Sequence, residues 1–178
     1  PHEKRPGDLS FTKYFLNAYD GFVCMSEDVR KDLLELKPDA SSVFHLHPLY
    51  DHFPPPIDKQ IAREKLGIPV DNKDLLFIGF IREYKGLDLL IKTLAQLPDD
   101  YVLLIAGEPY GDYSKYKSLI KENGVDDRVY EFVRYIDDDE VPLFYSASDV
   151  SMLTYKSATQ SGVVSISYHY DLPVIVTD

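Results

Sequence analysis

The chain has 178 residues, of which 44% are apolar, so it can bury the core of one domain, or of one domain and part of another. Acidic residues outnumber basic ones by 30 to 19, and the net charge of −11 argues against nucleic acid or an acidic membrane as the main partner. No apolar run approaches the roughly 20 residues of a membrane-spanning helix. The single cysteine, Cys24, allows neither an internal disulfide nor a cysteine-based zinc site.

Helix and strand patterns alternate over the first 50 residues. Apolar residues at helical spacing predict a helix over 9–19, and the apolar run 21–25 predicts a buried strand. Ser26 is placed to cap a following helix that ends before Pro38, and residues 42–47 give a second expected strand. We therefore interpret residues 1–50 as the end of a first Rossmann-like domain.

A proline-rich segment follows, and it predicts a boundary. Four prolines lie between Pro48 and Pro56, so residues 51–72 are expected to form a linker with a connecting helix over 58–66. From residue 73 to 178 we expect a second domain whose strands and helices alternate. The strands are expected at 74–81, 101–107, 129–133, 149–153 and 173–177, and the helices at 87–97, 114–123, 137–146 and 161–170.

The strands of this second domain are nearly continuous apolar runs, which indicates a parallel sheet covered on both faces. Their alternation with helices predicts an α/β fold with a doubly wound, Rossmann-like parallel sheet. The chain opens without Met and closes just after an apolar strand, so we expect it to be a truncated piece of a larger protein.

Ligands of open parallel sheets bind beyond the carboxyl ends of the strands, so the loops that follow the strands are the candidate sites. The first such loop, 79–86, combines Gly79, Arg82 and Lys85 with the start of a helix, and all four features suit a phosphate. The spacing of these residues is also compatible with an ordinary turn between a strand and a helix, in which the charged side chains are solvated and bind no ligand. It matches neither Gly-x-Gly-x-x-Gly nor a P-loop, so the sequence gives little support to a nicotinamide cofactor or to NTP hydrolysis.

Two further loops carry candidate ligand contacts. Arg134, Tyr135 and Ile136 follow the strand at 129–133 and are candidates to contact a base or ribose. The loop 155–162 offers hydroxyls, an amide and the free N–H groups of a helix start, which suit a sugar or phosphate. Its candidate residues are Thr159, Gln160, Ser161 and Gly162. The loop 107–112, in contrast, is interpreted as a plain turn.

Two clusters of metal-binding residue types have simpler interpretations. His45, His47 and His52 are close in sequence, but packing and hinge roles are favoured over a zinc site, which needs further ligands and shielding. The acidic run 137–140 is interpreted as the first turn of a helix.

The order of these motifs resembles the donor-binding half of the group 1 glycosyltransferases, which are retaining enzymes of the GT-B fold. Residues 20–51 are similar to the end of the acceptor half of these enzymes, and His47-Pro48 stands where the chain crosses between the halves. The segments that carry the resemblance are Gly79-x-x-Arg82-x-x-Lys85-Gly86, Leu103–Gly107, Asp127–Val129, Ser148–Val150, Ser161-Gly162 and Pro173–Thr177.

The resemblance implies transfer of a sugar from a nucleotide-sugar donor to a carbohydrate or lipid-linked acceptor, as in polysaccharide biosynthesis. It implies no metal and no cofactor, no nucleic-acid partner, and a cytoplasmic location with peripheral membrane contact through parts outside this chain. By the resemblance, Gly79, Arg82 and Lys85 contact the donor diphosphate. Lys85 matches the family's lysine directly, whereas Phe80 stands at the usual arginine position and Arg82 follows two residues later, on the same strand face.

The chain departs from the family where Ala158 and Ile166 stand at the positions of two glutamates that contact the donor sugar and the ribose. Two hypotheses follow. In the first, the chain is part of a glycosyltransferase and is inactive alone, because the acceptor half that carries the catalytic base is largely missing. In the second, it is a non-catalytic GT-B-like binding or partner subunit. The catalytic residues stay unassigned in both.

Overall fold

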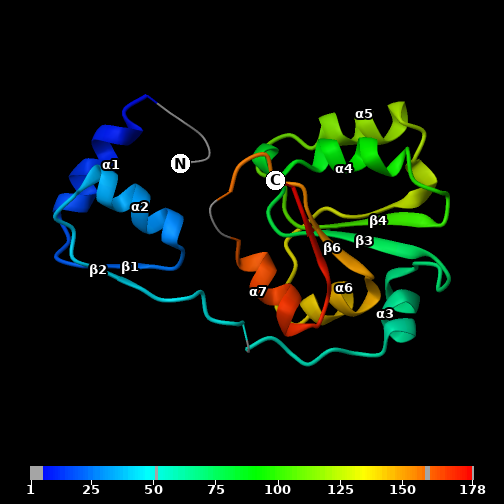
Figure 1. The fold of residues 1–178 in the computed structure, drawn as a ribbon. Coiled ribbons are helices and arrows are strands. Elements are labelled where there is room, and N and C mark those ends of the chain that lie inside the picture. Colours follow the sequence, from blue (N-terminus) through cyan, green and yellow to red (C-terminus); the bar gives the residue numbers. More distant parts are fainter. Residues whose placement is uncertain (1–5, 51, 159–160, 178) are drawn as a thin grey trace. The chain divides into compact units, whose positions relative to one another are not determined.

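The computed structural model describes residues 6–50, 52–158 and 161–177 and divides the chain into two compact units (Figure 1). The first unit comprises Pro1–Pro48 and Ser157–Gly162, and the second comprises Leu49–Lys156 and Val163–Asp178. In the part of the chain that the structure describes, no helix has both the length and the apolar character needed to cross a membrane.

The first unit is a small α/β unit with two parallel strands. Its elements in chain order are α1 (Asp8–Asn17), β1 (Phe22–Cys24), α2 (Glu27–Leu36) and β2 (Ser42–Phe44). β1 and β2 pair in parallel, with Val23 opposite Val43. Ser26 caps α2 as the sequence predicts, because its Oγ accepts a hydrogen bond from the Val29 N–H at 3.1 Å.

The second unit contains the larger sheet. Within its described residues, five parallel strands are ordered β5-β4-β3-β6-β7, and the strand order switches direction beside the central strand β3. The strands are β3 (Lys73–Ile78), β4 (Tyr101–Ala106), β5 (Val129–Phe132), β6 (Val150–Leu153) and β7 (Val174–Val176). The helices are α3 (Lys59–Leu66), η1 (Glu83–Lys85), α4 (Leu87–Leu94), α5 (Ser114–Glu122), η2 (Asp126–Arg128), α6 (Val141–Ala147) and α7 (Gly162–His169).

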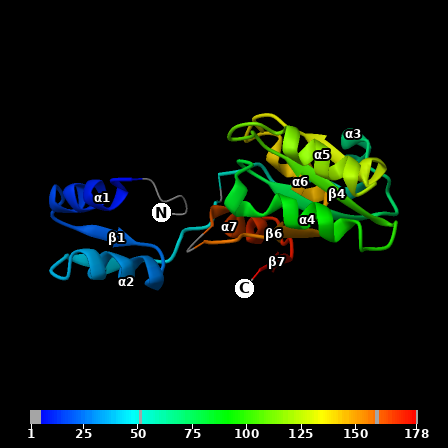
Figure 2. The ribbon, with the colours of Figure 1, turned by 90° about the horizontal axis from the view of Figure 1, so that it is seen from above.

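Alternating side chains of β3 and β4 build two cores, one on each face of the sheet. Leu75, Phe77 and their β4 neighbours pack against α4 and α5, which lie side by side (Figure 2). Leu76 and the other alternate positions pack against α3 and α6 (Figure 1). Both faces are therefore buried, which explains the continuous apolar runs of the strands. α3 contributes Ala62 and Leu66 to this second core.

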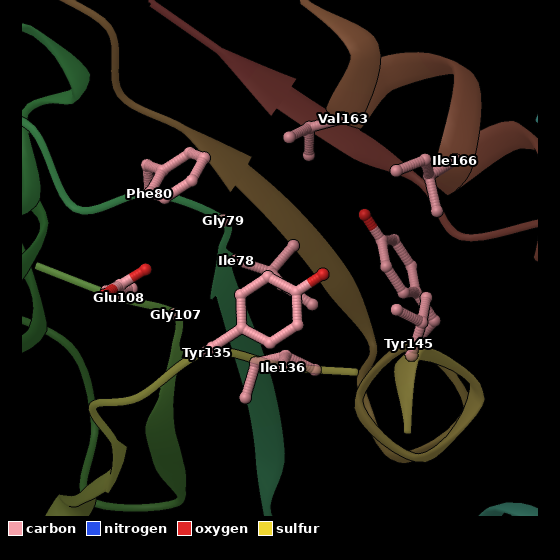
Figure 3. A pocket seen from close by; sticks show the side chains of 11 residues that line it. Ile78, Gly79, Phe80, Gly107, Glu108, Tyr135, Ile136, Tyr145, Val163 and Ile166 are labelled. Carbon is pink, nitrogen blue, oxygen red and sulfur yellow. The ribbon is translucent and has the colours of Figure 1, made fainter. Parts of the chain in front are cut away.

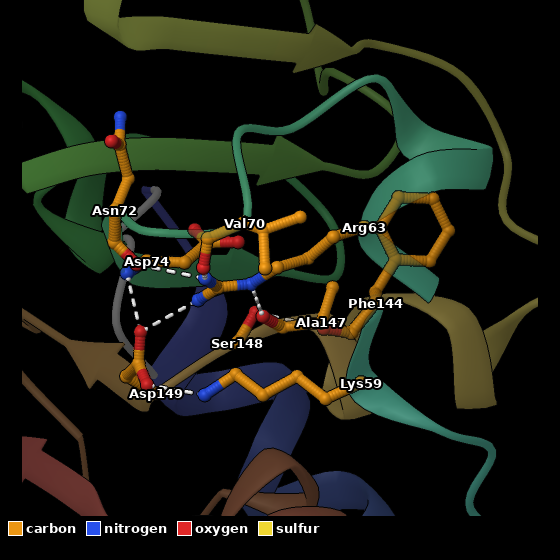
Figure 4. Close-up of polar contacts among 9 residues, drawn as sticks. All are labelled: Lys59, Arg63, Val70, Asn72, Asp74, Phe144, Ala147, Ser148 and Asp149. Atoms are coloured by element: carbon orange, nitrogen blue, oxygen red, sulfur yellow. Dashed lines mark hydrogen bonds and ion pairs between the residues drawn. The ribbon is translucent and has the colours of Figure 1, made fainter. Parts of the chain in front are cut away.

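A charged network fixes the amino ends of β3 and β6, opposite the candidate site loops (Figure 4). The buried guanidinium of Arg63 donates to Asp149 Oδ2 at 2.8 Å, and Lys59 also pairs with Asp149. The same guanidinium donates to the carbonyl oxygens of Ala147, Val70 and Asn72. Asp74 is fully buried beside this network, and burial raises its pKa to about 8, although the charge of Arg63 acts in the opposite direction.

Several expected boundaries differ from the structure. The strand expected over 42–47 ends at Phe44, and the helix expected over 87–97 ends at Leu94. The strand expected over 74–81 ends at Ile78, because Gly79 has a φ of +98°, which is incompatible with a strand. The acidic residues 137–140 precede α6 and do not form its first turn, since α6 begins at Val141 with Pro142 directly after it. The carboxylate of Glu140 instead binds the Arg134 guanidinium at 2.6 and 2.7 Å.

Candidate functional site

The loops that follow β3 and β4 are joined closely at the carboxyl edge of the sheet. The Gly79 N–H donates to Ala106 O at 2.9 Å, and the Ile81 N–H donates to Glu108 O at 2.9 Å. Gly107 has a φ of +144°, and a Cβ there would lie 2.2 Å from Gly79 O. The close approach of the two loops therefore requires glycine at position 107.

The junction between η1 and α4 is fixed by the end of β6. Gly86 ends η1 and begins α4 with a φ of +70°. A Cβ at Gly86 would lie 1.8 Å from Thr154 O, so only glycine fits without rearrangement. The Thr154 hydroxyl lies 3.1 Å from Lys85 O and 3.0 Å from Gly86 O and donates to this pair of carbonyls. The backbone that presents Lys85 is thus held by a neighbouring strand.

Lys85 is a largely buried cation at the site. The residue is 8% exposed, and its Nζ lies 3.2 Å from the position that a Cβ of Gly79 would occupy. Burial and the nearby charge of Arg82 lower the pKa of Lys85 to about 8. Its Nζ lies 5.8 Å from the centre of the Tyr155 ring, and among the described residues it has no carboxylate partner. A buried ammonium without a counterion favours an anionic ligand.

Arg82 lies beside this lysine, but the expectation that it continues the strand face is wrong. The chain leaves the strand at Gly79, so Arg82 is not on a strand face; it is the N-cap residue of η1. Its guanidinium stacks on the Tyr110 ring at 4.3 Å from the ring centre. Tyr110 belongs to the loop after β4, and the cation–π contact orients Arg82 at the edge of the sheet.

A mostly apolar cavity of about 150 Å³ opens at the same edge of the sheet (Figure 3). The loops after β3, β4 and β5 line it, together with one turn each of α6 and α7. In Figure 3, Val163 and Ile166 of α7 lie on one side and Phe80 and Glu108 lie on the other. The lining residues are Ile78, Gly79, Phe80, Gly107, Glu108, Tyr135, Ile136, Val141, Tyr145, Val163 and Ile166.

The three residues expected at a nucleoside have different positions. Tyr135 and Ile136 line the cavity. Arg134 does not, because both its terminal nitrogens bind Glu140 and one also donates to Tyr135 O at 2.8 Å. Hydrogen bonding to Glu140 raises the pKa of Arg134, and the same contact lowers that of Glu140. Arg134 therefore shapes the loop that presents Tyr135 and Ile136.

The expected sugar and phosphate loop is placed only in part. Thr159 and Gln160 lie outside the described residues. Ser161 and Gly162 group with the first unit, and Gly162 is the first residue of α7. Of the two positions where the family resemblance leads one to expect glutamate, Ala158 is exposed and Ile166 lines the cavity.

Several lining residues are not expected from the sequence. The loop 107–112 is more than the plain turn predicted for it, since Gly107 and Glu108 line the cavity, and the rule that ligands bind after strands would have included them. The apolar pattern of α6 predicts a core residue at Tyr145, and nothing in the sequence distinguishes it as a cavity residue from its buried neighbours. In the described ranges, no group of three histidine, cysteine or acidic side chains is arranged to hold a metal ion.

The arrangement joins two chemical environments within one unit. The cavity accepts a flat apolar group, such as an aromatic base, and Lys85 with Arg82 offers positive charge directly beside Gly79, which is part of the cavity wall. A ligand with an aromatic ring at one end and a phosphate group nearby fits both features.

Residues 58–178, more than half of the chain, match the family Glycosyl transferases group 1. The D-inositol 3-phosphate glycosyltransferase of Xylanimonas cellulosilytica is 31% identical over 123 residues, which cover 63% of this chain and 30% of that protein. The protein of the same name from Corynebacterium aurimucosum is 35% identical over 97 residues, 50% of this chain and 23% of that protein. The chain thus spans less than a third of the length of these relatives. Because the relatives are named as transferases, the non-catalytic alternative is not favoured.

Solved structures share the fold. Sucrose-phosphate synthase (tll1590) from Thermosynechococcus elongatus has a TM-score of 0.83 and 22% identity, and the match covers 98% of this chain and 44% of that chain. Anabaena Alr3699/HepE in complex with UDP and glucose has a TM-score of 0.74 and 19% identity, and the match covers 98% of this chain and 51% of that chain. The predicted α/β fold with Rossmann-like parallel sheets, of the kind found in GT-B glycosyltransferases, is therefore confirmed.

Proposed function

Because this chain belongs to the group 1 glycosyl transferases, we propose that its second unit binds the nucleoside diphosphate part of a nucleotide-sugar donor. The observation that carries the proposal is the position of Lys85 Nζ, which lies 3.2 Å from where a Cβ of Gly79 would be. Gly79 also lines the apolar cavity. One ligand can therefore place a base in the cavity and its diphosphate at the lysine.

The chemistry of the proposed contact is electrostatic. Lys85 and Arg82 neutralise the diphosphate, and the free N–H groups at the start of α4 add partial positive charge. In a transfer reaction, the same groups stabilise the diphosphate as it leaves the sugar. Gly79 permits the close approach because it has no side chain between Lys85 Nζ and the ligand.

The wider activity is proposed for the whole protein. It transfers a sugar, with retention of configuration, to a carbohydrate or lipid-linked acceptor. We propose that this requires neither a metal nor a cofactor, and that it takes place in the cytoplasm with peripheral membrane contact through other parts of the protein. The support is family membership and the shared fold of one solved structure, Anabaena Alr3699/HepE in complex with UDP-glucose.

Calorimetric titration of the chain with UDP, GDP and ADP tests the proposal. One of the three should bind saturably, and Lys85→Ala should weaken that binding about 10- to 100-fold, as expected when a charge-assisted contact is removed. Lys92→Ala is the matched control, because Lys92 is an exposed lysine in the last turn of α4 and its loss changes the net charge equally. Absence of binding by all three nucleotides, or equal effects of the two substitutions, would refute the proposed site.

A further inference from the structure

The Tyr145 side chain is held rigidly at the wall of the apolar cavity. Tyr145 is 2% exposed, and its ring stacks on Tyr170 with 5.0 Å between the ring centres and 21° between the planes. Tyr170 is itself fixed, since its hydroxyl donates to Pro54 O at 2.8 Å. In Figure 3 the Tyr145 ring rises from α6, and its oxygen lies at the end nearest Val163 and Ile166. The position of the hydroxyl is therefore set before any ligand binds.

The Tyr145 hydroxyl makes no hydrogen bond of ordinary geometry with any described residue. Ser167 is the polar neighbour that acts on it; Ser167 donates its proton to Val163 O at 2.8 Å, so its Oγ is left only as an acceptor, and this Oγ and the Tyr145 hydroxyl do not have hydrogen-bond geometry. Burial raises the pKa of Tyr145, so the hydroxyl stays neutral and keeps its proton. A buried hydroxyl without a partner costs on the order of 1–3 kcal/mol relative to a satisfied one. Such groups are rare in folded proteins unless a ligand completes them.

The wall nearest the Tyr145 hydroxyl is formed mainly by aliphatic side chains. Ile166 and Val163 of α7 are aliphatic, and Val141 of α6 is aliphatic as well. Glu108 is on the opposite side of the cavity (Figure 3). A ligand in this part of the cavity thus finds two side-chain hydroxyls, those of Tyr145 and Tyr135, between apolar surfaces, and of these two residues only Tyr145 is buried. Sites of this kind take orientation and specificity from the few polar groups present.

We infer that the Tyr145 hydroxyl hydrogen-bonds the nucleoside of the bound nucleoside diphosphate and contributes to its selection. The inference rests on the proposed function, because it needs a nucleotide whose phosphates lie at Lys85 and whose nucleoside enters the cavity. The ligand group is a polar atom of the base edge or a ribose hydroxyl, both of which can accept the tyrosine proton.

Tyr145→Phe tests the inference, because it removes the hydroxyl and keeps the ring. In calorimetric titrations with UDP, GDP and ADP, the variant should bind the preferred nucleotide about 5-fold more weakly than the native chain, as expected for one neutral hydrogen bond. Its unfolding midpoint should stay equal or rise, because the removed hydroxyl has no partner among the described residues of the free protein. A merely structural tyrosine would give the opposite pair of results, with lower stability and unchanged affinity.

Tyr116→Phe is the matched control, because Tyr116 is a buried tyrosine of α5 that does not line the cavity. It makes the same chemical change and should leave nucleotide affinity unchanged. Titration of the preferred nucleotide in its 2′-deoxy and 3′-deoxy forms then separates the two contacts. If Tyr145→Phe weakens the parent nucleotide but not a deoxy form, the partner is that ribose hydroxyl; if it weakens all forms, the partner is the base.

The outcomes separate this inference from the proposed function. If the native chain binds none of the three nucleotides, both are refuted. If the native chain binds and Lys85→Ala weakens binding, but Tyr145→Phe binds as tightly as the native chain, the proposed function stands and the role of Tyr145 is refuted.

Discussion

Asp74→Asn should stabilise the protein at alkaline pH, and the stabilisation should decrease as the pH falls. Asp74 is fully buried at the start of β3, and neither of its carboxylate oxygens has a hydrogen-bond partner among the described residues (Figure 4). Arg63 is close, but its donors already bind Asp149 and three carbonyl oxygens. Burial therefore dominates and favours the protonated acid.

The sign of the pH dependence follows from the two pKa values of Asp74. The native value is raised from 3.8 to about 8. Below the pKa of the unfolded state, the native and unfolded states both hold the Asp74 proton, and the native chain keeps its full stability. Between the two pKa values only the native state holds the proton, so the free energy of unfolding falls as the pH rises. Above the native pKa the fall in stability is complete. At about 1.36 kcal/mol for each pKa unit, the upper bound is about 6 kcal/mol.

Urea unfolding at pH 5, 7 and 9 measures this effect. The Asn variant keeps the shape of the side chain and cannot ionise, so its free energy of unfolding should exceed that of the native chain by about 2–6 kcal/mol at pH 9 and by about a third of that amount at pH 5, because pH 5 is already above the unfolded pKa. Asp139→Asn is the control, because Asp139 is exposed and the chemical change is identical. If Asp74→Asn destabilised the protein equally at all three pH values, Asp74 would be a charged partner of Arg63 and the reasoning would fail.

Two further predictions concern the loop that holds Lys85. The pKa of Lys85 is lowered to about 8, and only the charged lysine is expected to bind phosphate. The affinity for the preferred nucleotide, measured by calorimetry, should therefore fall ~8-fold between pH 7.5 and pH 9. The same loss of affinity in the Lys85→Ala variant would contradict this prediction. Gly86→Ala should lower the free energy of unfolding by about 2–4 kcal/mol, since its Cβ would lie 1.8 Å from Thr154 O. Gly124→Ala is the control, because Gly124 also has a positive φ but a Cβ there would meet no atom within 4 Å. The difference between the two variants in urea unfolding therefore measures the effect of the clash with Thr154.

The alternation of elements was predictable because each strand is a continuous apolar run and each helix has an apolar stripe. The caps were predictable too. Ser26 accepts a hydrogen bond from the N–H three residues later, as its position before a helix indicated. Asp58, expected as the first residue of its helix, is the N-cap and accepts the same kind of bond. These features depend on neighbours within one turn or one strand, so the sequence contains the information locally.

The features that were not predicted depend on residues distant in the sequence. Phe80 and Ile81 continue the apolar run of β3, but the chain turns at Gly79 because the loop after β4 binds it there. The pairing of Arg134, a candidate ligand contact, with the Glu140 carboxylate was not predicted. The burial of Asp74 depends on side chains from α3 and the start of β6. None of these contacts has a signature within a short window of sequence.

The two edges of the sheet show how stability and binding are separated in this unit. At the amino edge, each nitrogen of the Arg63 guanidinium is hydrogen-bonded within the described residues, and burial favours the neutral form of Asp74. At the carboxyl edge, two groups are incomplete: Lys85 lacks a described counterion and Tyr145 lacks a described hydrogen-bond partner. Both incomplete groups adjoin the same cavity, one through Gly79 and one directly. Since unsatisfied buried groups cost free energy, a ligand that satisfies both recovers that cost as affinity. Binding at the carboxyl edge is therefore expected on physical grounds, independently of family membership.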